Sequence, residues 1–339
     1  MEPLSNPGTD QPGTDCPRTD FERVDYEQPH FIRMKEILRS HPEIKQLFGP
    51  DARIAKWTVS LVAGQLALGA ILANRPLWVI VLAAYLIGAV ANHALWVVIH
   101  ECAHRLVFRG AVGNRLLCLL ANWPQVVPGG IPFCKYHLLH HAHQGEQDLD
   151  GDLATADEAR WVGNSTVRKA LLMLFFSFIQ GTIRPAQLTR VRLWDGWFVA
   201  NIISQLLFLS YYVQLAGWGA VLYLCASFVF SIGLHPLGGR WIAEHYLRHG
   251  HQETYSYYGP LNRLSFNVGY HNEHHDFMQV PWCRLPQVRA IASVHYDRLY
   301  AHPSWPEVLQ RFILSPQSTL YDRIVRPAPR RGHQDVRAD

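Results

Sequence analysis

Four long apolar stretches constrain this chain more than any other feature of its sequence. They contain about 17 to 22 residues each and cover residues 57–73, 77–98, 197–216 and 220–237. A helix rises about 1.5 Å per residue, so each stretch is long enough to cross a hydrocarbon layer roughly 30 Å thick. Only three residues join the members of each pair, which indicates tight helical hairpins. The sequence therefore predicts an all-α membrane protein with four transmembrane helices in two hairpins.

The composition supports a membrane protein with a large polar half. Only 17% of the residues are charged, whereas soluble domains typically contain roughly 25%, so a soluble helical protein is the less favoured alternative. The mean hydropathy of −0.04 is nevertheless too low for a chain that lies entirely in the bilayer. We expect the polar half to form a helical cap outside the membrane. The net charge of +4 is modest and gives no reason to expect a nucleic-acid partner.

Two further apolar stretches, 116–127 and 171–181, are too short to cross a bilayer and are interpreted as interfacial or re-entrant.

The composition divides the chain into four predicted segments. They are a disordered tail at 1–19, an N-terminal segment at 20–55, a membrane domain at 56–325 and a flexible tail at 326–339.

The distribution of basic residues predicts the orientation. Residues 99–196, between the two hairpins, carry ten Lys or Arg, whereas the two short hairpin loops carry one, Arg75. Because basic loops stay on the cytoplasmic side, both termini and the long middle segment are expected there. The membrane would be the inner membrane of a bacterium or the endoplasmic reticulum of a eukaryote.

Histidine clusters are the strongest chemical signal in the chain. One reads H-E-C-A-H from His100 to His104, and two read H-x-x-H-H, beginning at His137 and at His271. For 19 histidines in 339 residues, about 0.06 H-x-x-H-H triples are expected by chance, yet two occur. Spacings of three and four place side chains on one face of a helix. With four membrane crossings, all three clusters lie on the same side of the bilayer.

Eight clustered histidines are more than one metal ion can use, but two ions can share them. Imidazole nitrogen suits Zn, Cu, Fe and Ni, so the ligand type alone does not select the metal. The first cluster also fits H-E-x-x-H, the pattern of zinc proteases, with Glu101 as general base. An intramembrane zinc protease is a distant alternative, because it would leave both H-x-x-H-H triples without a function.

The three boxes around two hairpins resemble the membrane fatty-acid desaturase and hydroxylase superfamily. Within it, roughly residues 20–325 resemble the sphingolipid Δ4-desaturases, also called dihydroceramide desaturases. The stretches that carry this similarity are 242–246, 253–262 and 266–277, together with the N-terminal stretches 20–30, 33–38 and 42–45.

The resemblance implies two iron ions held by histidines, with His245 completing the set; His235 and His249 are weaker candidates for that place. Asp150 and Asp152 would orient imidazoles from outside the ligand set, as would Glu101 and Glu273. Arg240 stands where the family usually has histidine, which argues against an essential ligand there. The implied metal ligands are His100, His104, His137, His140, His141, His245, His271, His274 and His275.

The resemblance further implies the reaction and its partners. The expected activity is O₂-dependent insertion of a trans C4–C5 double bond into the sphingoid base of a membrane lipid, dihydroceramide. A sphingolipid C4-hydroxylase and an acyl-lipid or fatty-acid desaturase remain open alternatives. No residues beyond the metal ligands are expected to be catalytic. No H-P-G-G haem motif occurs, so a separate cytochrome b5 or ferredoxin-type protein would donate the electrons. The oligomeric state stays open.

Overall fold

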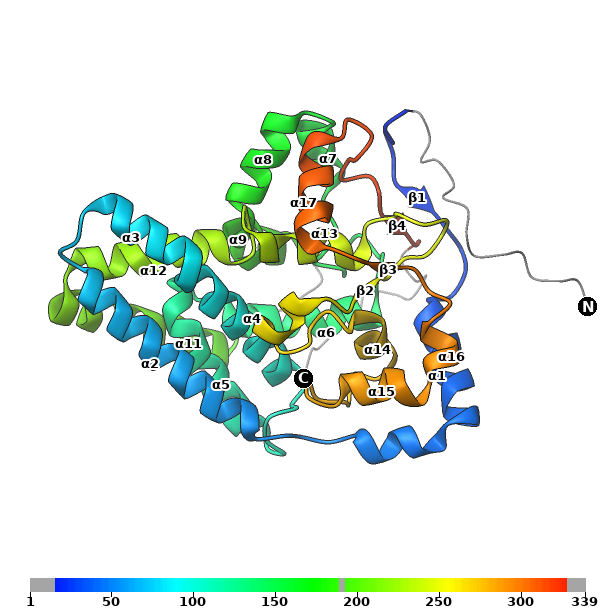
Figure 1. Cartoon of the computed structure of the whole chain (residues 1–339), viewed down its shortest axis with the longest axis horizontal. Coiled ribbons are helices and arrows are strands. Elements are labelled where there is room, and N and C mark those ends of the chain that lie inside the picture. Colours follow the sequence, from blue (N-terminus) through cyan, green and yellow to red (C-terminus); the bar gives the residue numbers. More distant parts are fainter. Residues whose placement is uncertain (1–15, 189–192, 328–339) are drawn as a thin grey trace, which may run out of the picture.

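The computed structural model describes residues 16–188 and 193–327, and this part of the chain is mostly helical. The long helices extend together to one side, on the left in Figure 1, and the shorter elements gather on the other. Helix α2 covers Arg53–Leu72 and α11 covers Gly196–Ala216. A single 27-residue helix, Leu77–Ala103, consists of α3 (Leu77–Ala83), the π-helical turn η2 (Ala84–Gly88) and α4 (Ala89–Ala103).

These three helices are long and apolar enough to cross a membrane. Their surfaces carry large apolar side chains that are mostly exposed, such as Trp57 and Leu207, and Trp218 at the start of the next helix is 77% exposed. Such an apolar surface is expected to contact lipid rather than water. The predictions for 57–73, 77–98 and 197–216 are therefore confirmed as unbroken helices of spanning length.

The fourth predicted stretch, 220–237, is not one helix. Helix α12 covers Trp218–Ser231, and the chain then continues through η5 (Pro236–Gly238) into α13 (Gly239–His245) after a bend of 42°. The break has a local cause: Gly233 packs so closely against the carbonyl oxygen of Met173 that a Cβ would not fit there. Pro236 follows and cannot donate a helical hydrogen bond.

Two other bent helix pairs contain the stretches interpreted as interfacial. Helix α5 (Ala111–Asn122) and η3 (Trp123–Gln125) meet α6 (Gly130–Ala142) at 114°. Helix α8 (Thr166–Leu174) meets the run formed by α9 (Phe176–Phe178), η4 (Ile179–Ile183) and α10 (Arg184–Gln187) at 58°. If each bent pair counts as one span, up to six segments are apolar enough to cross.

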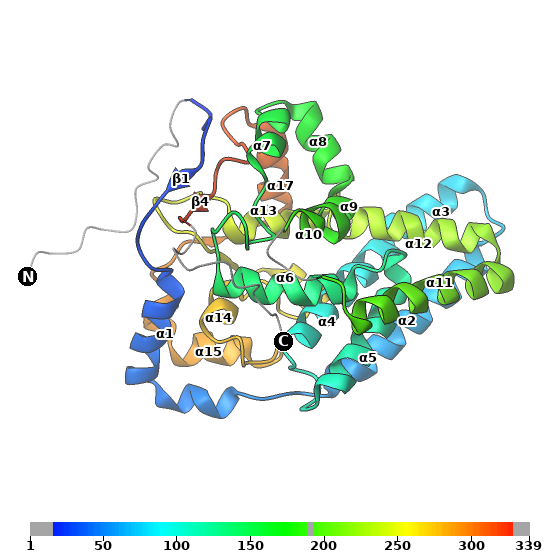
Figure 2. The same cartoon turned by 180° about the vertical axis from the view of Figure 1, so that it is seen from behind.

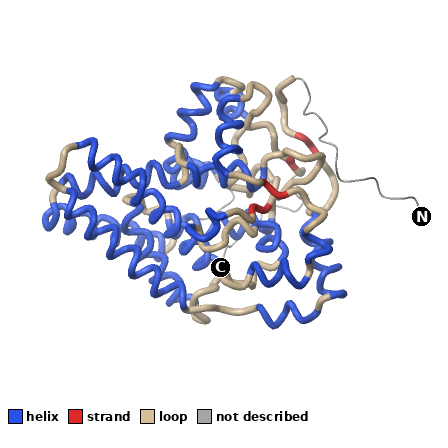
Figure 3. The backbone as a smooth tube through the Cα atoms, viewed as in Figure 1, coloured by secondary structure: helices blue, strands red, loops and turns tan. Residues whose placement is uncertain are grey.

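The polar half consists of short helices and four two-residue strands (Figures 2 and 3). Parallel pairing joins β1 (Glu22–Arg23) to β4 (Ile324–Val325) and β2 (Ser256–Tyr257) to β3 (Ala301–His302). The remaining elements are α1 (Pro29–Ser40), η1 (Pro42–Leu47), α7 (Ala156–Val162), η6 (Pro260–Leu264), α14 (His271–Asp276), α15 (Leu285–Ile291), α16 (Ser293–Tyr296) and α17 (Trp305–Leu314).

The N-terminal segment packs against helix α14. Ile37 and Ile44 are fully buried together with Phe277 and Val280 in one apolar cluster. At the other end of the chain, Arg326 is buried and donates hydrogen bonds to the carbonyl oxygen of Gln144 and to Glu253. Most of both predicted tails, residues 1–15 and 328–339, lies outside the described residues.

Candidate metal centre

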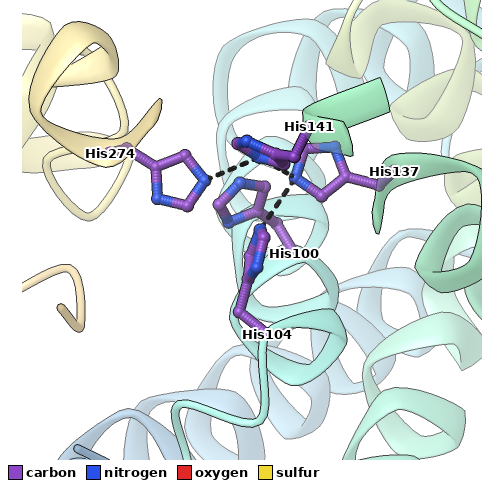
Figure 4. Close-up of side chains that lie close together, drawn as sticks. All are labelled: His100, His104, His137, His141 and His274. Atoms are coloured by element: carbon purple, nitrogen blue, oxygen red, sulfur yellow. Dashed lines mark hydrogen bonds between the residues drawn. The ribbon is translucent and has the colours of Figure 1, made fainter. Parts of the chain in front are cut away.

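Five histidines from three helices converge on one point, as Figure 4 shows. Helix α4 and its C-terminal cap supply His100 and His104, α6 supplies His137 and His141, and α14 supplies His274 from the opposite side. Each offers one ring nitrogen, and these nitrogens all lie within 4.8 Å of one another. The Nε2 atoms of the last four form a chain from His104 to His137 (3.0 Å), His141 (3.0 Å) and His274 (3.1 Å).

A second cluster lies beside the first and contains four histidines. His140 Nε2 and His271 Nε2 each lie 3.0 Å from His245 Nε2. The ring of His275 lies 4.5 Å from that of His271, and its Nε2 is buried without a hydrogen-bond partner in the described structure. Helices α6 and α14 each contribute to both clusters, because each H-x-x-H-H triple places some of its histidines in one cluster and the rest in the other. The structure thus brings together all nine predicted histidines.

The donor set fits two cations. A neutral imidazole carries one N–H, so a nitrogen such as His141 Nε2, which faces two other ring nitrogens, cannot satisfy both by hydrogen bonding. Burial, and then the neighbouring charges, hold the pKa of His271, His274 and His275 well below the ordinary histidine value. These three rings therefore stay neutral and offer lone pairs to a metal. Imidazole nitrogens suit iron, and the described ring nitrogens suffice for two ions.

Asp150 is placed to orient a ligand. Its Oδ1 accepts a hydrogen bond from His140 Nδ1 at 2.8 Å, so the Nε2 lone pair of His140 is left for the cluster. Asp152 lies farther away, at 3.6 Å from the same nitrogen, and accepts a hydrogen bond from Gln180 Nε2 at 2.6 Å instead. Of this predicted pair, Asp150 alone makes a close contact with an imidazole.

Two predicted glutamates are buried near the clusters, but their closest partners are not ring nitrogens. Glu101 Oε2 accepts a hydrogen bond from the amide of Trp282 at 3.1 Å, and its Oε1 lies 3.5 Å from His100 Nδ1. Glu273 accepts hydrogen bonds from Ser256 Oγ and Tyr258 Oη, both at 2.8 Å. Glu273 therefore ties α14 to β2, and its predicted place outside the ligand set stays a prediction.

The structure adds polar groups that spacing did not reveal. Glu244 Oε1 lies 3.5 Å from His271 Nδ1 and 3.1 Å from Arg240 Nε. Arg240 is therefore not a ligand, but it forms an ion pair with a carboxylate that lies next to one. The signal for Glu244 was present in the sequence, because it directly precedes His245. The ring of His30 lies 4.7 Å from that of His275.

The alternative histidines lie outside both clusters. His235 Nδ1 accepts a hydrogen bond from the amide of Leu237 at 3.2 Å and caps η5. His249 stacks on Tyr300 with ring centroids 5.3 Å apart. Neither belongs to a described group of potential metal ligands, so His245 is the better ninth candidate.

A helical membrane scaffold that directs three histidine boxes at two adjacent points is the architecture of a membrane desaturase. The model of the fatty acid desaturase family matches residues 76–305, and the chain belongs to this family. Residues 17–53 additionally match the model described as sphingolipid Δ4-desaturase. The chain is therefore an oxidoreductase, and within the family it belongs to the sphingolipid Δ4-desaturases, as the sequence predicted.

Relatives match over most of their length. Sphingolipid delta(4)-desaturase DES1 of Drosophila melanogaster is 42% identical over 311 residues, which cover 88% of this chain and 93% of that protein. Sphingolipid delta(4)-desaturase DES1-like of Oryza sativa subsp. japonica is 39% identical and covers 90% of this chain and 92% of its own. Sphingolipid delta(4)-desaturase/C4-monooxygenase DES2 of Rattus norvegicus is 40% identical, with 88% and 92% covered.

Replacing Asp150 with asparagine tests the role of the buried carboxylate. Burial opposes its charge, but the nearby His140 lowers the pKa of Asp150 to about 2, so it is ionised at neutral pH. Loss of such an outer partner typically lowers metal affinity or activity about 10- to 100-fold, and we expect a decrease in this range. Iron content and turnover of the purified variant measure it. Asp157→Asn is the control, because its carboxylate is exposed, and equal losses in both variants would contradict an orienting role.

Proposed function

We propose that this chain inserts the trans C4–C5 double bond into the sphingoid base of dihydroceramide. The observation that carries the proposal is the convergence of nine histidines into two adjacent clusters, in a chain whose relatives are named sphingolipid Δ4-desaturases. The clusters account for all three boxes. A zinc protease needs only three protein ligands and an open position, and it is incompatible with the desaturase family to which the chain belongs.

The reaction requires an oxidant. Converting CH₂–CH₂ to CH=CH removes two hydrogen atoms, and with O₂, two electrons and two protons it yields two molecules of water. Two iron ions, held by the five-histidine cluster and by the four-histidine cluster, would supply with O₂ the oxidising power that acid–base groups lack toward an unactivated methylene. The chain itself holds the ligands in place and shields them from water, since eight of the nine histidines are buried.

The proposed reaction requires a lipid substrate and an electron donor as partners. The lipid would enter from the bilayer, beside the apolar helices, with its polar end at the cytoplasmic surface. The basic segment 99–196 supports placing the boxes and both termini on the cytoplasmic side. A separate cytochrome b5 or ferredoxin-type donor would deliver the two electrons.

Expression in a host without Δ4-desaturation tests the proposal. Cells that carry the chain or its His274→Ala variant are fed dihydroceramide, and their lipids are examined by mass spectrometry. We expect loss of two hydrogens from the sphingoid base with the unaltered chain only. If neither chain changes the base although iron is bound and an electron donor is supplied, the assigned substrate is wrong and fatty-acyl lipids become the next candidates.

A second activity is supported by one comparison. The rat relative is named a Δ4-desaturase and C4-monooxygenase, and both outcomes begin with removal of hydrogen at C4. In the same experiment, a gain of one oxygen in the sphingoid base would identify C4-hydroxylation.

A further inference from the structure

A narrow cavity lies between the membrane helices and the histidine clusters. Its volume is about 10 Å³, close to the smallest space that holds one water-sized group. Its lining comes from helices α4, α6 and α13, from the π-helical η4 and from the break after α12. Irregular backbone near membrane depth is stable only when it is buried in protein or lines a cavity. The lining residues are Trp96, Phe133, Tyr136, Gln180, Gly181, Ile232, Arg240 and Trp241.

Two indole N–H groups of this lining have no acceptor in the described structure. Trp96 is 6% exposed and Trp241 is 9% exposed, and Nε1 of each is buried without a hydrogen-bond partner. Leaving a buried donor without an acceptor is unfavourable, so two such donors among the lining residues of one cavity require an explanation. Arg240 adds positive charge to the same wall, with its guanidinium 5.1 Å from the ring of Trp241. The cavity is thus built to receive an oxygen atom with a free lone pair.

The cavity borders the metal centre. The ring of Phe133 stacks on His137 at 5.0 Å on one side and lies 5.7 Å from Trp96 on the other. Trp96 precedes His100 by about one turn on the same helix. Arg240 connects to the second cluster through Glu244, which lies 3.5 Å from His271 Nδ1. Side-chain contacts therefore connect the cavity lining to both clusters.

We propose that Trp96 and Trp241, assisted by Arg240, bind an oxygen of the substrate's polar head and thereby select the carbon atoms that react. This inference rests on the proposed function. In a dihydrosphingoid base, C4 is bonded directly to the carbon that bears the 3-hydroxyl group, and the amide carbonyl is only a few bonds farther away. Fixing either oxygen against the two indoles determines how far the chain extends past the clusters, and neighbouring methylenes differ in no other way.

Variants that keep the rings but remove the N–H groups test this assignment. Trp96→Phe and Trp241→Phe are compared with Trp161→Phe, an exposed tryptophan distant in sequence from the cavity lining. Each enzyme receives dihydroceramide, a 3-deoxy analogue and an analogue with an N-alkyl group in place of the amide. Loss of one neutral hydrogen bond corresponds to about threefold to tenfold in affinity. We expect KM for dihydroceramide to rise by that factor in both cavity variants, with kcat within twofold.

The analogues distinguish the source of the oxygen. If the indoles bind the 3-hydroxyl, the unaltered enzyme prefers dihydroceramide over the 3-deoxy analogue and both cavity variants lose that preference. If the indoles bind the amide carbonyl, the unaltered enzyme prefers dihydroceramide over the N-alkyl analogue, and both cavity variants lose that preference. In either case the variants should also place part of the double bond away from C4–C5.

Unchanged preferences in both variants would overturn the inference and leave the cavity as the site of a structural water. The same holds if KM rises equally for all three lipids, because a purely structural defect has that effect. Failure of the unaltered enzyme to form any C4–C5 double bond would instead contradict the proposed function.

Discussion

Replacing His141 with alanine should reduce desaturation by more than about 100-fold, the upper range for loss of an outer partner of a metal ligand. His141 Nε2 lies between His137 Nε2 and His274 Nε2, at 3.0 and 3.1 Å. It therefore occupies the middle of the five-histidine cluster, where α6 meets α14. Removing this imidazole takes one donor from one ion and leaves the four-histidine cluster intact.

Metal analysis separates this effect from general unfolding. Purified His141→Ala protein should retain about one iron per chain, whereas the unaltered protein should hold two. His143→Ala is a matched control, because His143 lies two residues away but pairs with Glu146 at 3.1 Å and belongs to neither cluster. Full activity in the His141 variant, or equal losses in the two variants, would exclude His141 as a ligand.

Replacing Asp276 with alanine should destabilise the protein by about 3–5 kcal/mol, the range for removing one partner of a buried ion pair. The Asp276 carboxylate accepts hydrogen bonds from Arg33 Nε at 2.6 Å and Tyr296 Oη at 2.9 Å, and it lies 2.8 Å from His30 Nδ1. Burial opposes its charge, but Arg33 and His30 together lower the pKa of Asp276 below its ordinary value. Without it, the largely buried Arg33 guanidinium loses its anionic partner and keeps the neutral Asn272 Oδ1 at 3.1 Å.

The loss should also affect the metal centre, because Asp276 directly follows His274 and His275 on α14. Unfolding in mixed detergent micelles measures the free energy, and iron content at growth temperature measures the consequence for the clusters. Asp157→Ala serves as control: its ion pair with Arg160 is exposed, and such pairs contribute at most about 1 kcal/mol. Equal stabilities of the two variants would show that the network around Asp276 is not structural.

Spacing predicted the box histidines because helical periodicity is local. His137, His140 and His141 share one short helix, so their common direction follows from three- and four-residue spacing alone. His245 has no such partner in sequence, and it entered through family resemblance. The contact of His30 with Asp276 joins residues 246 positions apart. No periodicity encodes a contact of that kind, because it depends on how the N-terminal segment docks.

Hydropathy predicted the spanning helices but not their continuity. The stretch 220–237 is apolar throughout, so an average over it does not detect where the backbone leaves the helix at Ile232. Gly233 and Pro236 were the available signals in the sequence. The folded structure explains the glycine, because it packs closely against the backbone of Met173. The cavity that we assign to the substrate's head was equally invisible, since its lining residues come from segments that meet only in the folded chain.

The distribution of the histidines along the chain sets an order of assembly during biosynthesis. Helix α4 leaves the ribosome long before α14, yet each cluster takes at least one histidine from α14. Neither cluster is complete until α14 has emerged, and α1 must wait for the same helix before its Arg33 is neutralised. Loading of the proposed metal ions would therefore be a late event that follows insertion of the helices, and a product truncated before α14 would present incomplete ligand sets and an unpaired Arg33 to the machinery that removes defective membrane proteins.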